Sequence, residues 1–285
     1  MSKKPPFAEP VAAPAQPRDA VARQATMICA LQSTGRIGKS TSTQVIASWL
    51  EFAGIRWTGV DADPEHTNFS EYFMRVDRQP ITSAGSLDSI FRNAGRNTPV
   101  TLVDFPAGAT RTVLDHLETR QTLDALDARG VGLVILLFGS PDPTAEGSLR
   151  EVVTALRDRA RYVLIRNDAR FPSDKFDASP VAQRLRERGV PTITLPPLSP
   201  LTLREVAGLE NQFKRRLTWA EARGHVGTDS HFDLDNVFRR VAAQCEDAAE
   251  VLLPDPALVQ KRVERMPETE RRSLDKFSDP LDFEF

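Results

Sequence analysis

The residues with the clearest chemistry lie in one short segment, Met27-Ile-Cys-Ala-Leu-Gln-Ser-Thr-Gly-Arg-Ile-Gly-Lys-Ser-Thr41. An apolar run there leads into a glycine-bearing turn and then into a helical pattern. In a strand, turn and helix of this kind, successive backbone N–H groups and the helix N-terminus converge on one point and bind phosphate. The segment therefore predicts a phosphate-binding loop, whose turn is made by Gly35, Arg36, Ile37 and Gly38.

Side chains at the end of this turn would complete the contacts to a triphosphate. Lys39 would reach the β and γ phosphates, the Ser40 hydroxyl would coordinate Mg²⁺, and Thr41 would bond the α phosphate. The strict pattern G-x-x-x-x-G-K-[ST] requires a glycine at position 33, where this chain has Ser33. A chance match in a surface turn is therefore the alternative, and further motifs have to decide.

Carboxylates follow two further apolar runs. Val60-Asp-Ala-Asp-Pro64 carries Asp61 and Asp63, and Val100-Thr-Leu-Val-Asp-Phe-Pro-Ala-Gly108 carries Asp104. An aspartate after a strand can hold a water of the Mg²⁺ shell, and the Gly108 amide can sense a γ phosphate. Each stretch alone is compatible with a solvated acidic turn. Three such features in this order, each at the end of a strand, favour a nucleotide site.

The elements that must position these residues alternate along the chain. Apolar runs that predict buried strands end near Gln32, Val60, Phe105, Phe138, Ile165 and Leu195. Helical patterns lie between them at about 39–52, 87–93, 110–126, 144–159 and 181–188, and two more follow at 203–223 and 233–252. This alternation predicts an α/β fold, a mainly parallel sheet with helices on both faces. Such sheets bind ligands at the carboxyl ends of their strands.

Length and composition predict one large domain with appendages. At about 150 residues per domain, the 285 residues allow one large domain or two small ones. We expect a Pro/Ala-rich, disordered arm at 1–24 and a domain at 25–253, with a nucleotide core at about 25–210 and a helical extension at 203–253. Residues 254–285 are predicted to be a charged, loose tail.

Several classes of protein are disfavoured by the composition. The formal charge of -2 argues against a protein that coats nucleic acid, so any basic patch must be local. The longest apolar run, Val131 to Phe138, is far shorter than the roughly 20 residues that cross a bilayer. No signal sequence follows Lys3 and Lys4, so we expect a cytoplasmic protein. The cysteines and histidines show no spacing typical of a structural metal.

The motifs resemble those of the ParA/MinD family of P-loop ATPases, whose deviant Walker A loop has the form K-G-G-x-G-K-[ST]. The matching stretch is Thr34-Gly-Arg-Ile-Gly-Lys-Ser40. Asp61-Ala-Asp-Pro64 is similar to the family's D-x-D-P segment, and Val103-Asp-Phe-Pro-Ala-Gly108 is similar to its Walker B segment. Val163-Leu-Ile-Arg-Asn167 resembles the late strand that ends in an asparagine. The resemblance covers roughly residues 25 to 210.

The resemblance implies a slow, Mg²⁺-dependent ATPase that binds ATP and ADP. It implies that Lys39 binds phosphate, that Asp63 positions the attacking water, and that Asn167 contacts adenine. Asp104 and Asp63 would reach Mg²⁺ through water, beside the direct ligand Ser40.

One position departs from the family. The signature lysine, which in the family reaches across a nucleotide-dependent homodimer, aligns with Thr34. Arg36 is the candidate replacement, in cis or in trans, and the alternative is that Arg36 points into solvent. The departure puts ATP-driven dimerisation in question.

Three functions are compatible with these observations. The first is an ATP-driven switch in plasmid or chromosome partition, plasmid stability or conjugal transfer. It would contact DNA without sequence preference through Lys214, Arg215, Arg216 and Arg223, unless these residues only form a solvated helix face. The second is a carboxylate-activating ligase of the dethiobiotin-synthetase or cobyrinate-synthase type, with a pocket near Thr67, Asn68, Thr110, Arg111 and Thr112. The third is a nucleotide-binding adaptor that recruits a protein partner through its two tails.

Overall fold

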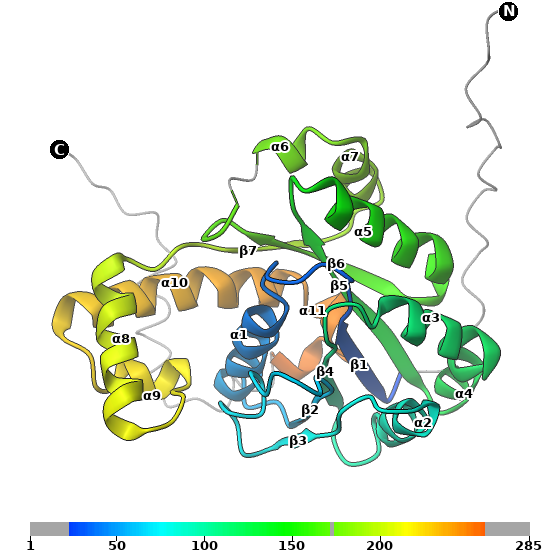
Figure 1. Ribbon diagram of the computed structural model, residues 1–285, viewed down its shortest axis with the longest axis horizontal. Coiled ribbons are helices and arrows are strands. Elements are labelled where there is room, and N and C mark those ends of the chain that lie inside the picture. The colour runs from blue at the N-terminus through cyan, green and yellow to red at the C-terminus, as the bar shows by residue number, and fades with distance from the viewer. Residues whose placement is uncertain (1–22, 172–173, 260–285) are drawn as a thin grey trace, which may run out of the picture.

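The computed structural model describes residues 23–171 and 174–259, and Figure 1 shows their arrangement. Seven strands form one sheet in the order β3-β2-β4-β1-β5-β6-β7, and every neighbouring pair is parallel. The strands are β1 (Ala25–Ala30), β2 (Trp57–Asp61), β3 (Val76–Arg78), β4 (Val100–Asp104), β5 (Val131–Gly139), β6 (Arg161–Asn167) and β7 (Thr192–Leu195). The predicted fold class is confirmed. Strand β3 was not predicted, because only Val76 of its three residues is buried.

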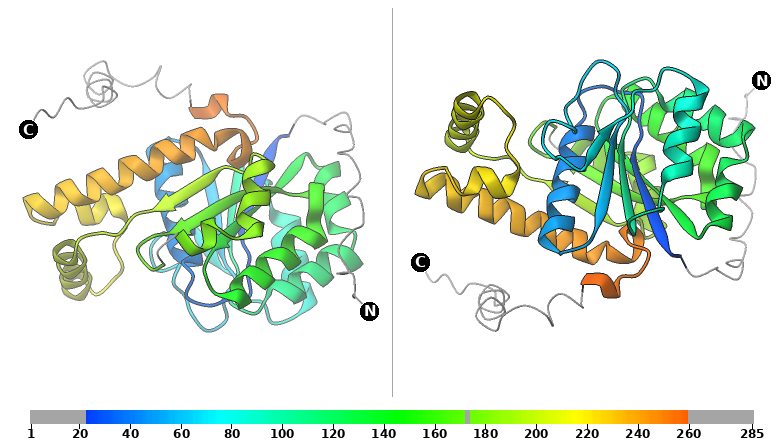
Figure 2. Two further views of the ribbon diagram at one scale, coloured as in Figure 1. Left: turned by 90° about the horizontal axis from the view of Figure 1, so that it is seen from above. Right: turned by 90° about the horizontal axis from the view of Figure 1, so that it is seen from below.

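Helices cover both faces of the sheet. They are α1 (Lys39–Phe52), α2 (Ala84–Asn93), α3 (Thr110–Thr119), α4 (Thr122–Ala128), α5 (Pro143–Leu156), α6 (Asp174–Asp177), α7 (Pro180–Glu187), α8 (Pro200–Phe213), α9 (Trp219–Arg223), α10 (Thr228–Asp247) and α11 (Ala249–Leu252), with a 3₁₀ turn η1 (Arg157–Arg159). Figure 2 shows α1 and α10 on one face and α3, α4 and α5 on the other. Two apolar cores, one on each side, therefore sandwich the strands.

Two predicted helices are each broken in two by a residue in the left-handed conformation. Gln121, with φ 50°, ends the helix predicted at 110–126 and separates α3 from α4. Lys214, with φ 55°, separates α8 from α9 inside the predicted 203–223 helix. A left-handed residue stops helical hydrogen bonding, and sequence patterns reveal it poorly when the residue is not glycine.

The C-terminal helices are partly core and partly a separate lobe. Val241, Cys245 and Leu252 pack in the same apolar cluster as Trp49 of α1, so α10 and α11 contribute to the apolar core on this face of the sheet. In contrast, α8, α9 and the start of α10 gather around a small cluster of Leu217, Ala222 and Leu234. None of the helices in the described ranges has the length and apolar content needed to cross a bilayer. Most of the predicted arm at 1–24 and tail at 254–285 lies outside the described residues.

Strand β7 is an edge of the sheet, and a side chain covers it. The amide group of Gln244 in α10 accepts a hydrogen bond from the Thr194 N–H at 2.8 Å and donates one to the Thr194 carbonyl at 3.3 Å. The neighbouring residue Leu195 instead accepts from Asp168 on the β6 side. The outward-facing main-chain groups of Thr194 are thus satisfied without another strand.

Candidate phosphate-binding site

The register of the sheet brings the predicted site residues to one edge. Ala30 at the end of β1 pairs with Asp104 of β4, and Asp104 pairs with Asp61 of β2. The loop after β1 therefore begins beside Asp104, and Asp61 lies one strand further along the same edge. These positions are far apart in the chain, so only the fold brings them together. The carboxyl edge of the sheet, where parallel strands place ligands, is therefore where the predicted site residues meet.

The turn after β1 contains a glycine whose backbone conformation other residues rarely adopt. Gly38 has φ 103° and ψ 19° and precedes α1, which has no side-chain cap. A Cβ atom at Gly38 would lie 2.4 Å from Nδ2 of Asn167, so a side chain would clash there. Because no side chain caps α1, the N–H groups of its first turn are available to an anion. This is the backbone geometry that a phosphate loop requires.

The Lys39 side chain packs against the predicted phosphate-binding loop. The side chain is buried, and its Nζ donates a hydrogen bond to the Thr34 carbonyl at 2.8 Å. Burial lowers the pKa of the ammonium group, whereas the carboxylates of Asp104 and then Asp63 act in the opposite direction. Both carboxylates are thus close enough to Lys39 to influence its charge, as the predicted site requires.

Asp104 is the most perturbed acid of the site. Its side chain is 4% exposed, and its Oδ1 has no hydrogen-bond partner. Burial raises the pKa of Asp104 to about 7; a hydrogen bond from Ser40 lowers it, Asp61 raises it, Lys39 lowers it and Asp63 raises it. A buried carboxylate oxygen without a partner is costly unless a cation or a water completes its environment.

A Mg²⁺ ion at this place would need the phosphates of a bound nucleotide as further ligands. Within residues 23–171 and 174–259, no group of three or more His, Cys, Asp or Glu residues could hold a metal ion. Mg²⁺ usually keeps several waters and binds to one or two carboxylates together with substrate phosphates. Ser40 and the orphaned oxygen of Asp104 fit that mode of binding.

The two aspartates that follow β2 have different roles. Asp61 is buried, and its Oδ2 accepts hydrogen bonds from the Phe69 N–H, the Ser70 N–H and the Ser70 hydroxyl at 2.9 to 3.0 Å. Asp61 therefore organises the loop. Asp63 is half-buried, and its Oδ1 accepts from the N–H groups of residues 65 and 66, which leaves its Oδ2 without a bond in this turn.

The remaining predicted contacts are placed as follows. Gly35, Arg36 and Thr41 are exposed on the loop and the first turn of α1. Arg36 has φ 59°, a left-handed conformation that is unusual for a residue with a side chain. The Gly108 N–H, predicted to sense a γ phosphate, donates to the Ser33 carbonyl at 3.1 Å. A γ phosphate would have to compete with that bond, and the role of Gly108 stays a prediction.

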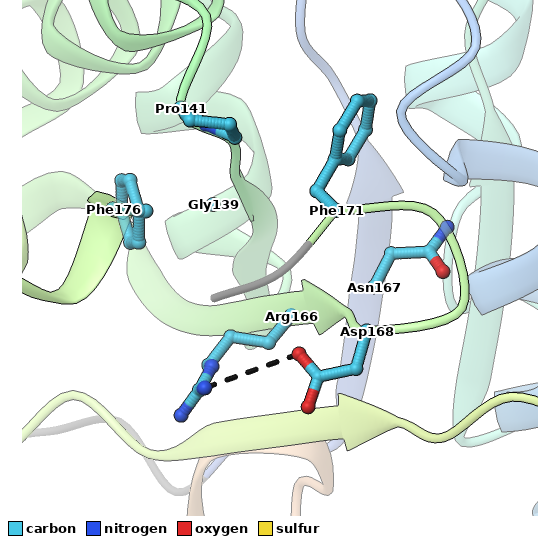
Figure 3. Close-up of a pocket in the computed structure, with 7 residues that line it drawn as sticks. All are labelled: Gly139, Pro141, Arg166, Asn167, Asp168, Phe171 and Phe176. Carbon is cyan, nitrogen blue, oxygen red and sulfur yellow. Dashed lines mark ion pairs between the residues drawn. The ribbon is translucent and has the colours of Figure 1, made fainter. Parts of the chain in front are cut away.

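Asn167 faces the phosphate loop from the end of β6. Its Nδ2 donates to the Ile37 carbonyl at 3.4 Å, and Figure 3 shows its side chain directed away from the Arg166–Asp168 pair. The adjoining cavity, of about 10 Å³, is lined by Gly139, Pro141, Arg166, Asn167, Asp168, Phe171 and Phe176. A space of that size holds about one water and is too small for a nucleobase. The contact of Asn167 with adenine stays a prediction.

The three arginines among the predicted DNA-binding residues form ion pairs, most of them within the helical lobe. Arg215 pairs with Glu221 at 2.7 Å, and Arg216 pairs with Glu210 at 2.7 Å and with Glu71 at 3.6 Å. Arg223 pairs with Asp235, whereas Lys214 is exposed at the end of α8. Any phosphate contact by the three arginines would compete with these carboxylates.

The residues proposed for a ligase pocket are largely engaged elsewhere. The Thr67 hydroxyl bonds to Glu71, Thr110 is fully buried, and Arg111 forms ion pairs with Asp115 and Glu151. These contacts give the ligase hypothesis no convergent set of free polar groups.

Gln32 is a contributor that sequence reasoning missed. The side chain is fully buried, and its amide accepts from the Phe138 N–H at 2.9 Å and donates to the Ala145 carbonyl at 2.8 Å. The only sequence signal was a polar residue at the end of an apolar run. Gln32 therefore anchors the start of the phosphate loop to β5 and α5.

Comparison with known proteins supports the fold. No protein-family model and no curated protein matches the sequence. Among solved structures, the septum site-determining protein MinD from Pyrococcus horikoshii, in complex with Mg-ADP, is similar with a TM-score of 0.52 and 17% identity, covering 79% of this chain and 97% of that chain. A ParA family ATPase from Chlorobium tepidum has a TM-score of 0.48 and 15% identity, covering 78% of this chain and 98% of that chain.

The sheet order, the glycine-bearing loop before α1 and the buried acid at the end of β4 define a P-loop nucleotide-binding fold. Within that class, the fold is similar to that of MinD from Pyrococcus horikoshii.

Proposed function

We propose that this protein is a Mg²⁺-dependent ATP-binding and ATP-hydrolysing switch. The observation that carries the proposal is the juxtaposition of an uncapped helix N-terminus at Gly38, the buried Lys39 and the orphaned carboxylate oxygen of Asp104 at one edge of the sheet. Positive backbone groups, a lysine and an acid for a metal shell are the parts that phosphoryl transfer uses, because it depends mostly on positioning and charge stabilisation.

Each residue has one role in the proposed reaction. Bound Mg-ATP supplies the triphosphate and the metal charge that partly neutralises it. The first N–H groups of α1 and the Lys39 ammonium bind the phosphates, for which Lys39 exchanges its bond to the Thr34 carbonyl. Ser40 and Asp104 are the residues that would hold the metal of bound Mg-ATP. Asp63 orients the attacking water with the carboxylate oxygen that is free of the turn.

Replacing Asp63 with asparagine tests the hydrolytic step. The asparagine Oδ1 can still accept the two N–H groups of the turn, so the loop is preserved while the charge is lost. We expect the kcat for ATP hydrolysis to fall by about 100-fold or more, with the Kd for ATP within about threefold of wild type. Phosphate release measures the kcat, and titration with ATP measures the Kd. Unchanged hydrolysis in Asp63→Asn would remove Asp63 from the reaction.

Arg36 is the proposed replacement for the missing signature lysine. Arg36→Ala should lower ATP hydrolysis at least about tenfold without loss of ATP binding, because an arginine that reaches the γ phosphate stabilises mainly the transition state. Arg36→Gly should lower hydrolysis equally but raise the melting temperature, since glycine adopts φ 59° without the cost of about 1 kcal/mol that a side chain incurs. Arg36→Lys keeps the charge and is the control.

Light scattering decides whether Arg36 acts in trans. A homodimer that forms with ATP, dissociates with ADP and loses its ATP dependence in Arg36→Ala would support action across an interface. A monomer in every nucleotide state, with the hydrolysis defect of Arg36→Ala retained, would assign Arg36 to its own site.

The biological role that we propose is partition or transfer of DNA, for which the support is the local cluster around Lys214. Because Arg215, Arg216 and Arg223 are ion-paired, DNA binding through them should be weak and steeply salt-dependent. Binding to a random-sequence duplex at low and moderate salt, with and without ATP, tests this role. Absence of binding in all four conditions would leave the ATP switch and remove DNA as its partner.

A further inference from the structure

The residue that begins the phosphate loop has both backbone groups bonded to other parts of the fold. The Ser33 N–H donates to the Ser148 hydroxyl of α5 at 2.8 Å, and the Ser33 carbonyl accepts from the Gly108 N–H at 3.1 Å. Ser33 does not have a positive φ, so this position does not need the glycine of the strict motif. The loop is thus held at its start by two outside contacts.

Of these two contacts, the one to α5 depends on a side chain. Ser148 is 7% exposed and lies 115 residues from Ser33 in the chain. The residue before Ser33 is tied to the same helix, because Gln32 donates to the Ala145 carbonyl. Ala145 and Ser148 are three residues apart, so they lie on the same face of α5. Two consecutive residues at the start of the loop are therefore fastened to one face of one helix.

The start of α5 is itself well fixed. Asp142 caps the helix by accepting from the Thr144 N–H, and Pro143 occupies the first turn. A helix fixed in this way is a rigid support. Because the Ser33 N–H donates to the Ser148 hydroxyl, the position of α5 fixes the position of Ser33. Without that acceptor, the Ser33 N–H would lose its partner, and Ser33 would keep only the bond from the Gly108 N–H to its carbonyl.

We propose that Ser148 is a positioning residue for nucleotide binding, which acts by orienting the phosphate loop through the Ser33 N–H. The assignment rests on the proposed function, since it concerns the same phosphate site. Ser148 touches no phosphate in this role. It sets the direction of the loop, so that the later N–H groups and Lys39 meet the phosphates together.

The test compares Ser148→Ala with Ser148→Thr and with a matched control. Ser148→Ala should raise the KM for ATP about fivefold and leave kcat within about twofold, because loop orientation affects bound substrate and transition state alike. Ser148→Thr keeps the hydroxyl and should restore most of the affinity. Ser230→Ala removes another buried hydroxyl, in α10, that has no hydrogen-bond partner among the described residues, and should leave the KM for ATP unchanged.

The outcomes separate this assignment from the proposed function. If wild type neither binds nor hydrolyses ATP, the proposed function fails and the role of Ser148 fails with it. If wild type hydrolyses ATP and Ser148→Ala has the wild-type KM, only the role of Ser148 is overturned. An equal rise of the KM for ATP in Ser148→Ala and Ser148→Thr also overturns the role of Ser148, because the hydroxyl would then not matter.

A direct measurement covers the case in which Ser148→Ala does not fold. Amide hydrogen exchange of Ser33, followed by NMR in wild type, reports the hydrogen bond itself. We expect Ser33 to exchange at least about 100-fold more slowly than an unstructured amide. Exchange at the unstructured rate would overturn the assignment.

Discussion

Lys39→Ala is expected to abolish measurable ATP binding. The ammonium group is buried at the loop, and removal of one partner of a buried charge contact weakens binding by about 100-fold or more. The fold should survive, because burial lowers the pKa of Lys39 and the loss of a buried charge removes its desolvation cost. Titration with a fluorescent ATP analogue measures the affinity, and a melting curve checks the fold.

Lys214→Ala is the matched control for this variant. Lys214 is an exposed lysine in the helical lobe, so its removal should leave the affinity for ATP unchanged. If Lys39→Ala bound ATP as wild type does, the assignment of residues 34–40 as a phosphate loop would be wrong.

Asp104→Asn is expected to change the stability of the protein in a pH-dependent way, besides abolishing Mg²⁺-dependent hydrolysis. Burial raises the pKa of Asp104 from 3.8 to about 7, so the nucleotide-free protein holds a proton there that the unfolded chain releases. The associated stability is fully present below pH 3.8 and is lost as the pH rises through about 7. The slope from this group is at most about 1.4 kcal/mol per pH unit.

The comparison with wild type isolates that group. Asparagine is neutral at every pH, so Asp104→Asn should be more stable than wild type at pH 8, and the difference should shrink toward pH 5. Denaturant unfolding at several pH values, without nucleotide or metal, measures the difference. A constant difference between pH 5 and pH 8 would mean that Asp104 is ionised throughout and that its burial has no such effect.

The same titration bears on Mg²⁺ binding. A proton on Asp104 competes with the metal shell, so the Mg²⁺ dependence of ATP affinity should weaken below about pH 7 in wild type and be weaker at every pH in Asp104→Asn.

Local patterns predicted the parts of the site that lie within one stretch of chain. The start of α1 at Lys39 and the aspartates at the ends of β2 and β4 are found at the predicted positions, because a strand, a turn and a helix leave a local signature. The resemblance assigned the attacking water to Asp63 and assigned no role to Asp61, whose place in the loop became visible only in the structure. The difference between the two aspartates arises from the N–H groups of Phe69 and Ser70, which come back to Asp61 from farther along the loop.

Contacts across the fold were beyond sequence reasoning. Ser148 is an ordinary small residue in a helical pattern, and its bond to Ser33 exists because β5 lies beside β1 in the sheet and α5 follows β5 in the chain. The left-handed residues Gln121 and Lys214, which break two helices, also gave no signal, since both residue types are common in helices.

The side chain of Gln244 limits strand addition at one edge of the sheet. An uncovered edge strand is a template on which another chain can add a strand, as in peptide recognition or in aggregation. Gln244 bonds to both outward main-chain groups of Thr194, so these groups of β7 are not free to pair with another strand. The opposite edge strand, β3, is only three residues long. Among the described residues, both edges of the sheet therefore offer little free backbone, which disfavours dimers or polymers that continue the sheet from one copy into the next.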